Sequence, residues 1–398
     1  MSILSNRINN LDESATLKMS KLGRELSAKG IDVISLSLGE TDFYTPDFVK
    51  DAAKKAIDGN FSYYTPVPGY PELRKAIAEK LKRENNLDYT FDQIVVSTGA
   101  KQSLTNIILS LVNPGDEVII PTPYWVSYSE LVKLAEGVSV FIDTTLESDF
   151  KITPEELEAA ITPQTKLFMF SSPNNPTGTV YTKDELAGLA KVFEKYPNIY
   201  IISDEIYEHI NFLGEHASIA QFAEIKDRVI IINGLSKAYA MTGWRLGFSA
   251  SNKTIAVANE KLQGQTTSGT CSISQKAGVA AYNGNLDSVN AMRAVFEKRR
   301  NLVYSLLKDI PGMKVNLPGG AFYFFPDVSS FFGKTSESGE VINTSDELAL
   351  YILNTGHVAV VSGDGFGDKN SIRISYAASE EKLIEAASRI KSALAKLK

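Results

Sequence analysis

The sequence predicts an α/β protein, with a large mainly parallel β-sheet domain flanked by helices and a smaller α+β domain. Three observations predict this class. Between about residues 93 and 251, short β-rich runs alternate with helical stretches, as in consecutive βα units. Several runs are apolar throughout, which is typical of strands covered on both faces. Beyond about residue 287 the pattern changes to a long charged helix and short strands with Gly-rich turns.

The strands of the large domain are expected in chain order. They are residues 94–97, 117–121, 166–171, 199–204, 228–233 and 244–249. A helix is predicted over residues 102–112, because the Pro and Gly of the following turn stop it. We place this domain at residues 47–287.

The small domain combines both ends of the chain. A charged helix over residues 288–308 can lead the chain back toward its start, so residues 1–46 are expected to pack with residues 288–398. Residues 333–339 are small and polar and predict a surface loop. A last helix is predicted from Glu380 to the end.

Composition excludes several classes of protein. Among 398 residues, 43% are hydrophobic and 22% charged, as in an ordinary globular protein. The formal charge of −6 argues against nucleic-acid binding, which needs a basic surface. No apolar run approaches the roughly 20 residues that span a bilayer. The first residues, MSILSNRINN, lack the apolar segment of a signal peptide. We expect a cytoplasmic protein that binds no membrane.

Cysteine and histidine usage predicts neither a disulfide nor a metal site. Cys271 is the single cysteine and cannot form an internal disulfide. His209, His216 and His357 lack the spacing of metal ligands.

Polar motifs follow five of the expected strands at their carboxyl ends, where open α/β sheets bind ligands. We expect these ends to converge on one crevice. The motifs are Thr98-Gly99-Ala100-Lys101, Tyr124-Trp125, Ser172-Pro173-Asn174-Asn175-Pro176, Asp204-Glu205-Ile206-Tyr207 and Asn233-Gly234-Leu235-Ser236-Lys237.

The first motif leads into a helix, so its free backbone N–H groups can cradle a phosphate, with a simple helix cap as the alternative. No G-x-G-x-x-G occurs, and Gly333-Lys334-Thr335 lacks the earlier glycine of a P-loop. The sequence therefore argues against dinucleotide and ATP binding.

Lys237 is the candidate catalytic amine. It follows Ser236 at a crowded strand end, and Arg245 lies eight residues later. Desolvation and a nearby cation lower the pKa of a lysine, which suits a Schiff-base amine, and Ser236 and Arg245 can then hold a phosphate. A solvated lysine beside a structural arginine is the alternative.

Together these motifs resemble those of the class I, fold-type I pyridoxal-phosphate (PLP) aminotransferases. The sequence is most similar to bacterial aspartate aminotransferases of the subgroup that also contains prephenate-using members. The resemblance covers nearly the whole chain and implies the fold-type I architecture. It rests on YWVSY at 124–128, SPNNPTG at 172–178, SDEIYEH at 203–209 and the Lys237 segment.

The resemblance implies the catalytic roles. Lys237 is expected to bind PLP and to carry the transferred proton. Asp204 is expected to keep the pyridine nitrogen protonated, although a helix cap or salt bridge is its alternative. Tyr207 and Asn175 are expected to donate to the phenolate oxygen of the ring. Trp125 is expected to stack on the ring. For Trp125 and Tyr207, the alternative is that they are simply core aromatics.

The resemblance also implies the remaining cofactor contacts. Tyr64 aligns with a tyrosine that reaches the phosphate of the neighbouring subunit in relatives, which implies a homodimer. The phosphate of PLP is expected to lie among Gly99, Ala100, Lys101, Ser236 and Arg245.

The expected substrates are small amino acids and 2-oxo acids. Arg373 matches the arginine that binds the substrate α-carboxylate with its planar fork, and an exposed edge charge is the alternative. Gly39 is expected to offer a backbone group, with Trp125 and Asn175 beside the substrate. Lys101 matches a lysine that helps to hold a distal carboxylate, so a dicarboxylic amino acid is expected.

The leading hypothesis is an aspartate:2-oxoglutarate aminotransferase with ping-pong kinetics. Asp12-Glu13 stands where many relatives have a basic residue and a proline, so prephenate stays open as a substrate. An aromatic aminotransferase and a C–S β-lyase are alternatives, because this fold hosts many PLP reactions. A non-catalytic protein that kept the fold is a further alternative, against which the intact Lys237 and Asp204 argue.

Overall fold

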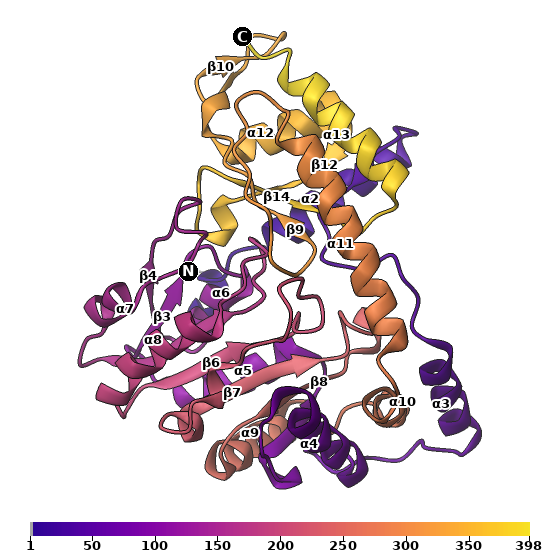
Figure 1. Ribbon diagram of the computed structural model, residues 1–398, viewed down its shortest axis with the longest axis vertical. Coiled ribbons are helices and arrows are strands. Elements are labelled where there is room, and N and C mark those ends of the chain that lie inside the picture. Colours follow the sequence, from indigo (N-terminus) through magenta and orange to yellow (C-terminus); the bar gives the residue numbers. More distant parts are fainter. Residues whose placement is uncertain (1–2) are drawn as a thin grey trace.

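The chain forms two halves that are joined by one long helix and by the segment between residues 35 and 47. The computed structural model describes residues 3–398. Figure 1 shows the main sheet and most of its helices in the lower part of the view, and a smaller half above it that the chain reaches through α11 (Asp287–Leu307). Each half has its own cluster of buried apolar residues. The predicted α/β class is confirmed, whereas the predicted domain boundaries stay a prediction.

Within residues 3–398 the main sheet has seven strands, in the order β2-β8-β7-β6-β5-β3-β4. They run parallel to one another except β8, which is antiparallel to both of its neighbours. The strands are β2 (Ile94–Ser97), β3 (Glu117–Pro121), β4 (Val138–Ile142), β5 (Thr165–Ser171), β6 (Tyr200–Asp204), β7 (Val229–Gly234) and β8 (Gly247–Ala250).

Two strands differ from the sequence prediction. Strand β4 is not predicted, although its sequence Val-Ser-Val-Phe-Ile is largely apolar; it is the edge strand of the sheet and, among the described residues, pairs only with β3. Strand β8 is predicted from residue 244 but begins at Gly247. The reason is local, since Thr242–Trp244 form a 3₁₀ turn and Arg245 has a left-handed backbone with a φ of 55°.

Helices cover the main sheet and also flank its edges. Several begin with a capping box, such as the one in which Thr182 and Glu185 satisfy each other's backbone N–H groups at the start of α8. The helices of this half are α3 (Asp47–Asp58), α4 (Pro71–Asn85), α5 (Ala100–Leu111), α6 (Ser127–Leu134), α7 (Pro154–Ala160), α8 (Lys183–Lys195), α9 (Lys253–Thr266) and α10 (Ser272–Asn283).

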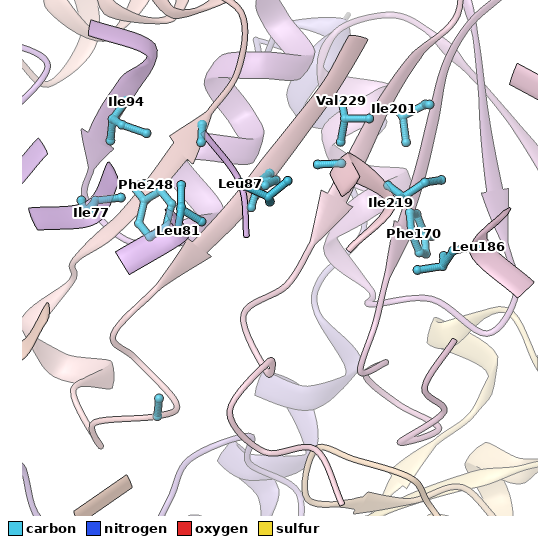
Figure 2. Packing of buried hydrophobic residues seen from close by; sticks show 14 of the residues in the cluster. Ile77, Leu81, Leu87, Ile94, Phe170, Leu186, Ile201, Ile219, Val229 and Phe248 are labelled. Carbon is cyan, nitrogen blue, oxygen red and sulfur yellow. The ribbon is translucent and has the colours of Figure 1, made fainter. Parts of the chain in front are cut away.

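Both faces of the sheet are buried because its strands are apolar on both sides. In β5, Phe168 belongs to one buried cluster and its neighbour Leu167 to another. Figure 2 shows the first cluster, in which Ile77 and Leu81 of α4 lie beside Phe248 of β8. Helix α5 contributes to the second cluster. Apolar area buried on both sides fixes the strands, so the loops at their ends are held in place.

The upper half is built around a small antiparallel sheet. Its order is β13-β14-β9. Strand β1 (Ile34–Ser35) pairs with β12 (Val358–Ala359), so the N-terminal segment packs in this half. The other elements are α2 (Ala15–Ala28), β9 (Tyr323–Phe324), β10 (Lys334–Thr335), β11 (Val341–Ile342), α12 (Ser345–Tyr351), β13 (Val361–Ser362), β14 (Ile372–Ser375) and α13 (Glu380–Leu394). The short helix α1 (Asn6–Asn9) instead lies against α6 of the main half, where Arg7 pairs with Glu136.

Two predictions for the upper half need correction. The loop expected at residues 333–339 contains β10, which pairs with β11 as an antiparallel ribbon around a turn at Gly339. The last helix, α13, stops at Leu394 and not at the chain end. Among residues 3–398, no helix is both long and apolar enough to cross a bilayer.

The topology of the main sheet places several loops at one edge. The carboxyl ends of β2, β3, β5, β6 and β7 lie there because these strands are parallel. Strand β8 runs the opposite way, so Arg245, two residues before it, lies at the same edge. The five motifs predicted to converge therefore do so.

Candidate active site

A cavity of about 350 Å³ lies at this edge, between the two halves of the chain. Each of the five strand-end motifs contributes to its wall, and the upper half adds Gly39, Tyr323 and Arg373. The predicted site residues that line it are Gly39, Ala100, Lys101, Trp125, Asn175, Asp204, Tyr207, Ser236, Lys237, Arg245 and Arg373.

Asp204 ends β6 with its carboxylate inside the protein. Tyr128 Oη donates a hydrogen bond to its Oδ2 over 2.8 Å, and the Ile206 N–H donates to its Oδ1 over 3.2 Å. Burial raises the pKa of Asp204 to about 6, although both donors favour the ionised form. The carboxylate is thus a buried acceptor held between two donors, and it has no cationic hydrogen-bond partner among the described residues.

Lys237 reaches the cavity three residues after the end of β7. Its Nζ donates a hydrogen bond to the carbonyl oxygen of Gly39 over 2.6 Å. Burial, together with the positive charge of Arg373, lowers the pKa of Lys237 to about 8. The solvated lysine considered from the sequence is therefore wrong, because this amine lies inside the cavity with a pKa suited to a nucleophile.

Arg373 lies on β14, the central strand of the small sheet. The residue is 1% exposed, so the alternative of an exposed edge charge is wrong. Its Nη1 donates to Asn175 Oδ1 over 2.9 Å, and its Nη2 donates to the Ser37 carbonyl over 2.5 Å. Its Nε has no partner among residues 3–398. The guanidinium is fixed but retains donor capacity toward the cavity.

One end of the cavity forms a cradle for an anion. Helix α5 begins there at Ala100, with free N–H groups in its first turn. Gly99 has a φ of +83°, and a Cβ at this position would overlap the guanidinium of Arg245. Arg245 is held in turn by a 2.8 Å bond from Nη1 to the Thr242 carbonyl. The glycine thus allows helix and guanidinium to approach one anion together.

Two important site residues are missed by sequence reasoning. Tyr128 lies within the YWVSY motif but receives no role there. Tyr323 is fully buried, and its hydroxyl lies 2.7 Å from that of Tyr207. It occurs in the run Phe322-Tyr323-Phe324-Phe325, so it reads as a core aromatic. The feature that could have pointed to Tyr323 is its hydroxyl, because a tyrosine buried within an apolar run needs a hydrogen-bond partner for that group.

A buried ionic cluster lies behind the loop that carries Asp204 and Tyr207. Glu208 accepts hydrogen bonds from Lys80 and from the Asn233 side chain. His216 pairs with Glu205, with Nε2 3.1 Å from Oε2. The spacing of the histidines does not predict this cluster, because its members come from different elements. Glu205 Oε1 accepts hydrogen bonds from Ser203 and Ser218, whereas its Oε2 contacts His216 only as an ion pair.

Comparison with known proteins identifies the family. Residues 31–390 match the family described as aminotransferase class I and II. The chain belongs to this family. A probable aspartate/prephenate aminotransferase from Rhizobium leguminosarum bv. phaseoli is 47% identical to this aminotransferase over 98% of both chains.

Solved structures agree with this family. The aspartate aminotransferase of Rhizobium meliloti has a TM-score of 0.96 at 42% identity, covering all of both chains. The Thermus thermophilus aspartate aminotransferase with maleate has a TM-score of 0.92 at 38% identity, covering 99% of this chain and 100% of that one. The fold-type I architecture is therefore confirmed.

Class I and II aminotransferases depend on PLP, and the cavity of this aminotransferase fits that coenzyme. It offers a buried carboxylate for the ring nitrogen, an amine for the aldehyde, and a helix start with an arginine for the phosphate. Among the described residues, its charged lining comprises Lys101, Lys237, Arg245 and Arg373 against Glu40 and Asp204. This excess of positive charge suits a phosphorylated coenzyme together with carboxylate substrates.

Proposed function

We propose that this aminotransferase moves the amino group of L-aspartate to 2-oxoglutarate, giving oxaloacetate and L-glutamate by a ping-pong mechanism. The observation that carries the proposal is the presence in the cavity of two cations, Arg373 and Lys101, besides Lys237 and Arg245. Two cations suit a substrate with two carboxylates. The relatives named aspartate aminotransferase support the same choice, one of them solved with the dicarboxylate maleate.

Lys237 is the proposed base and anchor of the reaction. Its Nζ holds the coenzyme until the substrate amine replaces it, and the freed amine then takes the proton from the substrate Cα. When bound, PLP supplies a ring that accepts the negative charge left at that carbon. A pKa of about 8 lets a useful fraction of this amine be neutral near pH 7.

Asp204 is proposed to hold the pyridine nitrogen in its protonated form. A carboxylate and a cation that are buried side by side each stabilise the charged form of the other, because no water screens their attraction. Tyr128 keeps the carboxylate oriented through its 2.8 Å bond. Tyr207 and Asn175 are proposed to donate to the phenolate oxygen of the ring, and Trp125 to cover the ring face.

The remaining contacts are proposed for the coenzyme phosphate and the substrate. Gly39 is expected to offer a backbone group to the substrate, but its carbonyl binds Lys237 in this structure. The Gly39 carbonyl can therefore bind substrate only after Lys237 moves, whereas this bond does not engage the Gly39 N–H. The phosphate contacts are proposed for Gly99, Ala100, Lys101, Ser236 and Arg245.

A homodimer with shared sites is part of the proposal. Tyr64 is 98% exposed, and Tyr63 and Tyr44 nearby in sequence are 85% and 90% exposed. A tyrosine this exposed in one subunit is free to reach into a neighbouring subunit, as the family resemblance implies for Tyr64. Sedimentation should show a dimer, and Tyr64→Phe should weaken PLP binding, whereas a monomer with unchanged PLP affinity would contradict this part.

Prephenate, converted to arogenate, is the second candidate acceptor. A neighbouring cavity of about 620 Å³ shares Ser14, Lys101, Val126 and Ser127 with the first, which gives room for a bulkier dicarboxylate. Asp12 lines it and is paired with Lys133 over 2.7 Å. A relative named probable aspartate/prephenate aminotransferase also favours this candidate.

A steady-state panel tests the assignment. Aspartate, tyrosine and cystathionine are supplied as donors, with 2-oxoglutarate or prephenate as acceptor. We expect aspartate with 2-oxoglutarate to give the highest kcat/KM, with parallel double-reciprocal lines. Pyruvate from cystathionine would instead indicate a lyase, and a preference for tyrosine would indicate an aromatic aminotransferase.

A further inference from the structure

Tyr323 touches both functional ends of the cavity. Its hydroxyl lies 2.7 Å from that of Tyr207, and the Arg373 guanidinium carbon lies 4.7 Å from the centre of its ring. Gly39 leaves space for the same hydroxyl, because a Cβ there would overlap it. The side chain is fully buried and lines the cavity. One residue therefore contacts the tyrosine proposed to face the coenzyme and the arginine proposed to face the substrate.

The small sheet explains why Tyr323 and Arg373 meet. In the register of β9 and β14, Tyr323 is opposite Ser375. Arg373 is two residues from Ser375, so it projects from the same face of the sheet as Tyr323. Tyr207 comes from the loop after β6 in the main half. The contact between the two phenols therefore joins the main sheet to the small sheet at the cavity.

The number of protons on the two phenols limits which of them donates the hydrogen bond. Burial raises the pKa of both Tyr207 and Tyr323, so both are neutral near pH 7. Each phenol then has one proton, and only one of them donates across the 2.7 Å contact. Tyr207 can donate to a ligand in the cavity only if it accepts from Tyr323. A phenol that accepts one hydrogen bond is also a stronger donor in its own bond.

We propose that Tyr323 is a positioning residue for transamination: its hydroxyl donates to Tyr207 and so directs the Tyr207 proton into the cavity, while its ring holds the guanidinium of Arg373. This inference rests on the proposed function, in which Tyr207 donates to the phenolate oxygen of the coenzyme. Removal of the Tyr323 hydroxyl weakens that donation without removing Tyr207. Removal of its ring also loosens Arg373, because the cation loses the aromatic face beside it.

The pKa of the bound coenzyme chromophore, read from the visible absorbance between pH 5 and 9, tests the hydroxyl. Tyr207 stabilises the phenolate form, so Tyr207→Phe should raise this pKa by about 1 unit or more. Tyr323→Phe should raise it by about 0.5 unit, and should add nothing when Tyr207 is already Phe. Tyr376→Phe is the matched control, because Tyr376 is equally buried and its hydroxyl donates to the Ala321 carbonyl over 3.0 Å outside the cavity.

A second variant covers the case in which Tyr323→Phe does not fold. Replacing Tyr323 with 3-fluorotyrosine keeps the hydroxyl and makes it a stronger donor, so the chromophore pKa should fall. A rise or no change would contradict the proposal. Only variants whose thermal unfolding curves match that of the wild type are included in the comparison of chromophore pKa values.

Binding of maleate tests the ring. Tyr323→Phe should keep maleate affinity within about twofold, whereas Tyr323→Leu should weaken it about tenfold, as expected for a lost cation–π contact of about 1 kcal/mol or more. Equal maleate affinity in the Phe and Leu variants would overturn the part of the proposal that concerns Arg373.

The outcomes separate this inference from the proposed function. If Tyr207→Phe leaves the chromophore pKa unchanged, the proposed role of Tyr207 is wrong. If Tyr207→Phe raises the pKa but Tyr323→Phe matches the wild type, the proposed function stands and the inference about Tyr323 is overturned. An equal effect of Tyr323→Phe with and without the Tyr207 hydroxyl would also overturn it, because Tyr323 would then act without Tyr207.

Discussion

Tyr128 donates a 2.8 Å hydrogen bond to Asp204, and both side chains are almost completely buried. The bond joins the first turn of α6 to the end of β6. It holds one oxygen of the carboxylate while the Ile206 N–H holds the other. Asp204 is thus oriented before any ligand arrives, which is the kind of preorganisation that active sites need.

Replacing Tyr128 with Phe should weaken coenzyme binding and slow the reaction. The change removes one donor to the buried carboxylate, so the pKa of Asp204 should rise above about 6. We expect PLP affinity and kcat each to fall about tenfold, which corresponds to about 1.4 kcal/mol. Tyr181→Phe is a suitable control, because Tyr181 is a buried phenol bonded to the backbone of Ile152. Equal losses in both variants would contradict the role of Tyr128.

PLP affinity should depend on the ionisation of Asp204. The folded-state pKa of about 6 lies above the ordinary value of 3.8, so the coenzyme-free protein takes up a proton as the pH falls through 6. A neutral Asp204 cannot pair with a cationic ring nitrogen, so affinity should fall below pH 6. Titrating the coenzyme-free protein with PLP from pH 5 to 8 checks this. Asp204→Asn should bind more weakly and lose this contribution, leaving the titrations of Lys237 and of the coenzyme itself.

The same shift affects folding stability with a definite sign. A raised carboxyl pKa means that the folded state binds more protons than the unfolded state between about pH 4 and 6. The contribution of Asp204 to the stability of the coenzyme-free protein should therefore decrease as the pH rises through this window. Denaturant titrations of the wild type and of Asp204→Asn measure the difference, and an increase with pH for this contribution would contradict the burial argument.

Gly99→Ala should impair coenzyme binding more than it impairs folding. Its Cβ would overlap the Arg245 guanidinium, and its φ of +83° adds backbone strain of about 1 kcal/mol. We expect the Kd for PLP to rise at least about tenfold. Gly115→Ala is the matched control, because Gly115 has a φ of +86° with open space around it. If both variants bind PLP equally well, the proposed phosphate cradle is wrong.

Arg373→Lys should separate charge from geometry. Lysine keeps the positive charge but cannot bond to Asn175 and Ser37 while also presenting a planar fork to a carboxylate. We expect kcat/KM for aspartate to fall about 100-fold, or about 2.7 kcal/mol. Arg389→Lys is the control, since Arg389 binds Asp32 and Glu385 away from the cavity. Near-normal activity of Arg373→Lys would rule out a specific carboxylate clamp.

Apolar patterning predicts the sheet and the edge that carries the site. Runs such as those of β5 and β7 are apolar on both sides, so their position follows from burial, and their parallel direction follows from the alternation with helices. Polar residues at their ends then mark the cavity. Strand β4 has a similar apolar run, Val-Ser-Val-Phe-Ile, and is missed all the same; only the fold shows that it forms the edge of the sheet, with Val138 and Phe141 exposed. The early start predicted for β8 fails because the left-handed turn at Arg245 has no apolar signature.

Long-range contacts are what sequence reasoning cannot supply. The bond between Lys237 and Gly39 joins residues 198 positions apart, and that between Tyr207 and Tyr323 joins residues 116 apart. Lys237 is singled out by its motif with Ser236 and Arg245 at a strand end, and Arg373 by the resemblance to a known family. Tyr323 and Tyr128 have side chains that also occur in ordinary cores, so their roles emerge only from the partners that the fold brings to them.

The most direct test of the account is a half-reaction with purified, PLP-loaded enzyme and L-aspartate in the absence of any 2-oxo acid. The account predicts a loss of the visible coenzyme band and release of one equivalent of oxaloacetate per active site, and it predicts that Lys237→Ala releases none at a comparable rate. Wild-type release by the Lys237→Ala variant, or no oxaloacetate from the wild type, would contradict it.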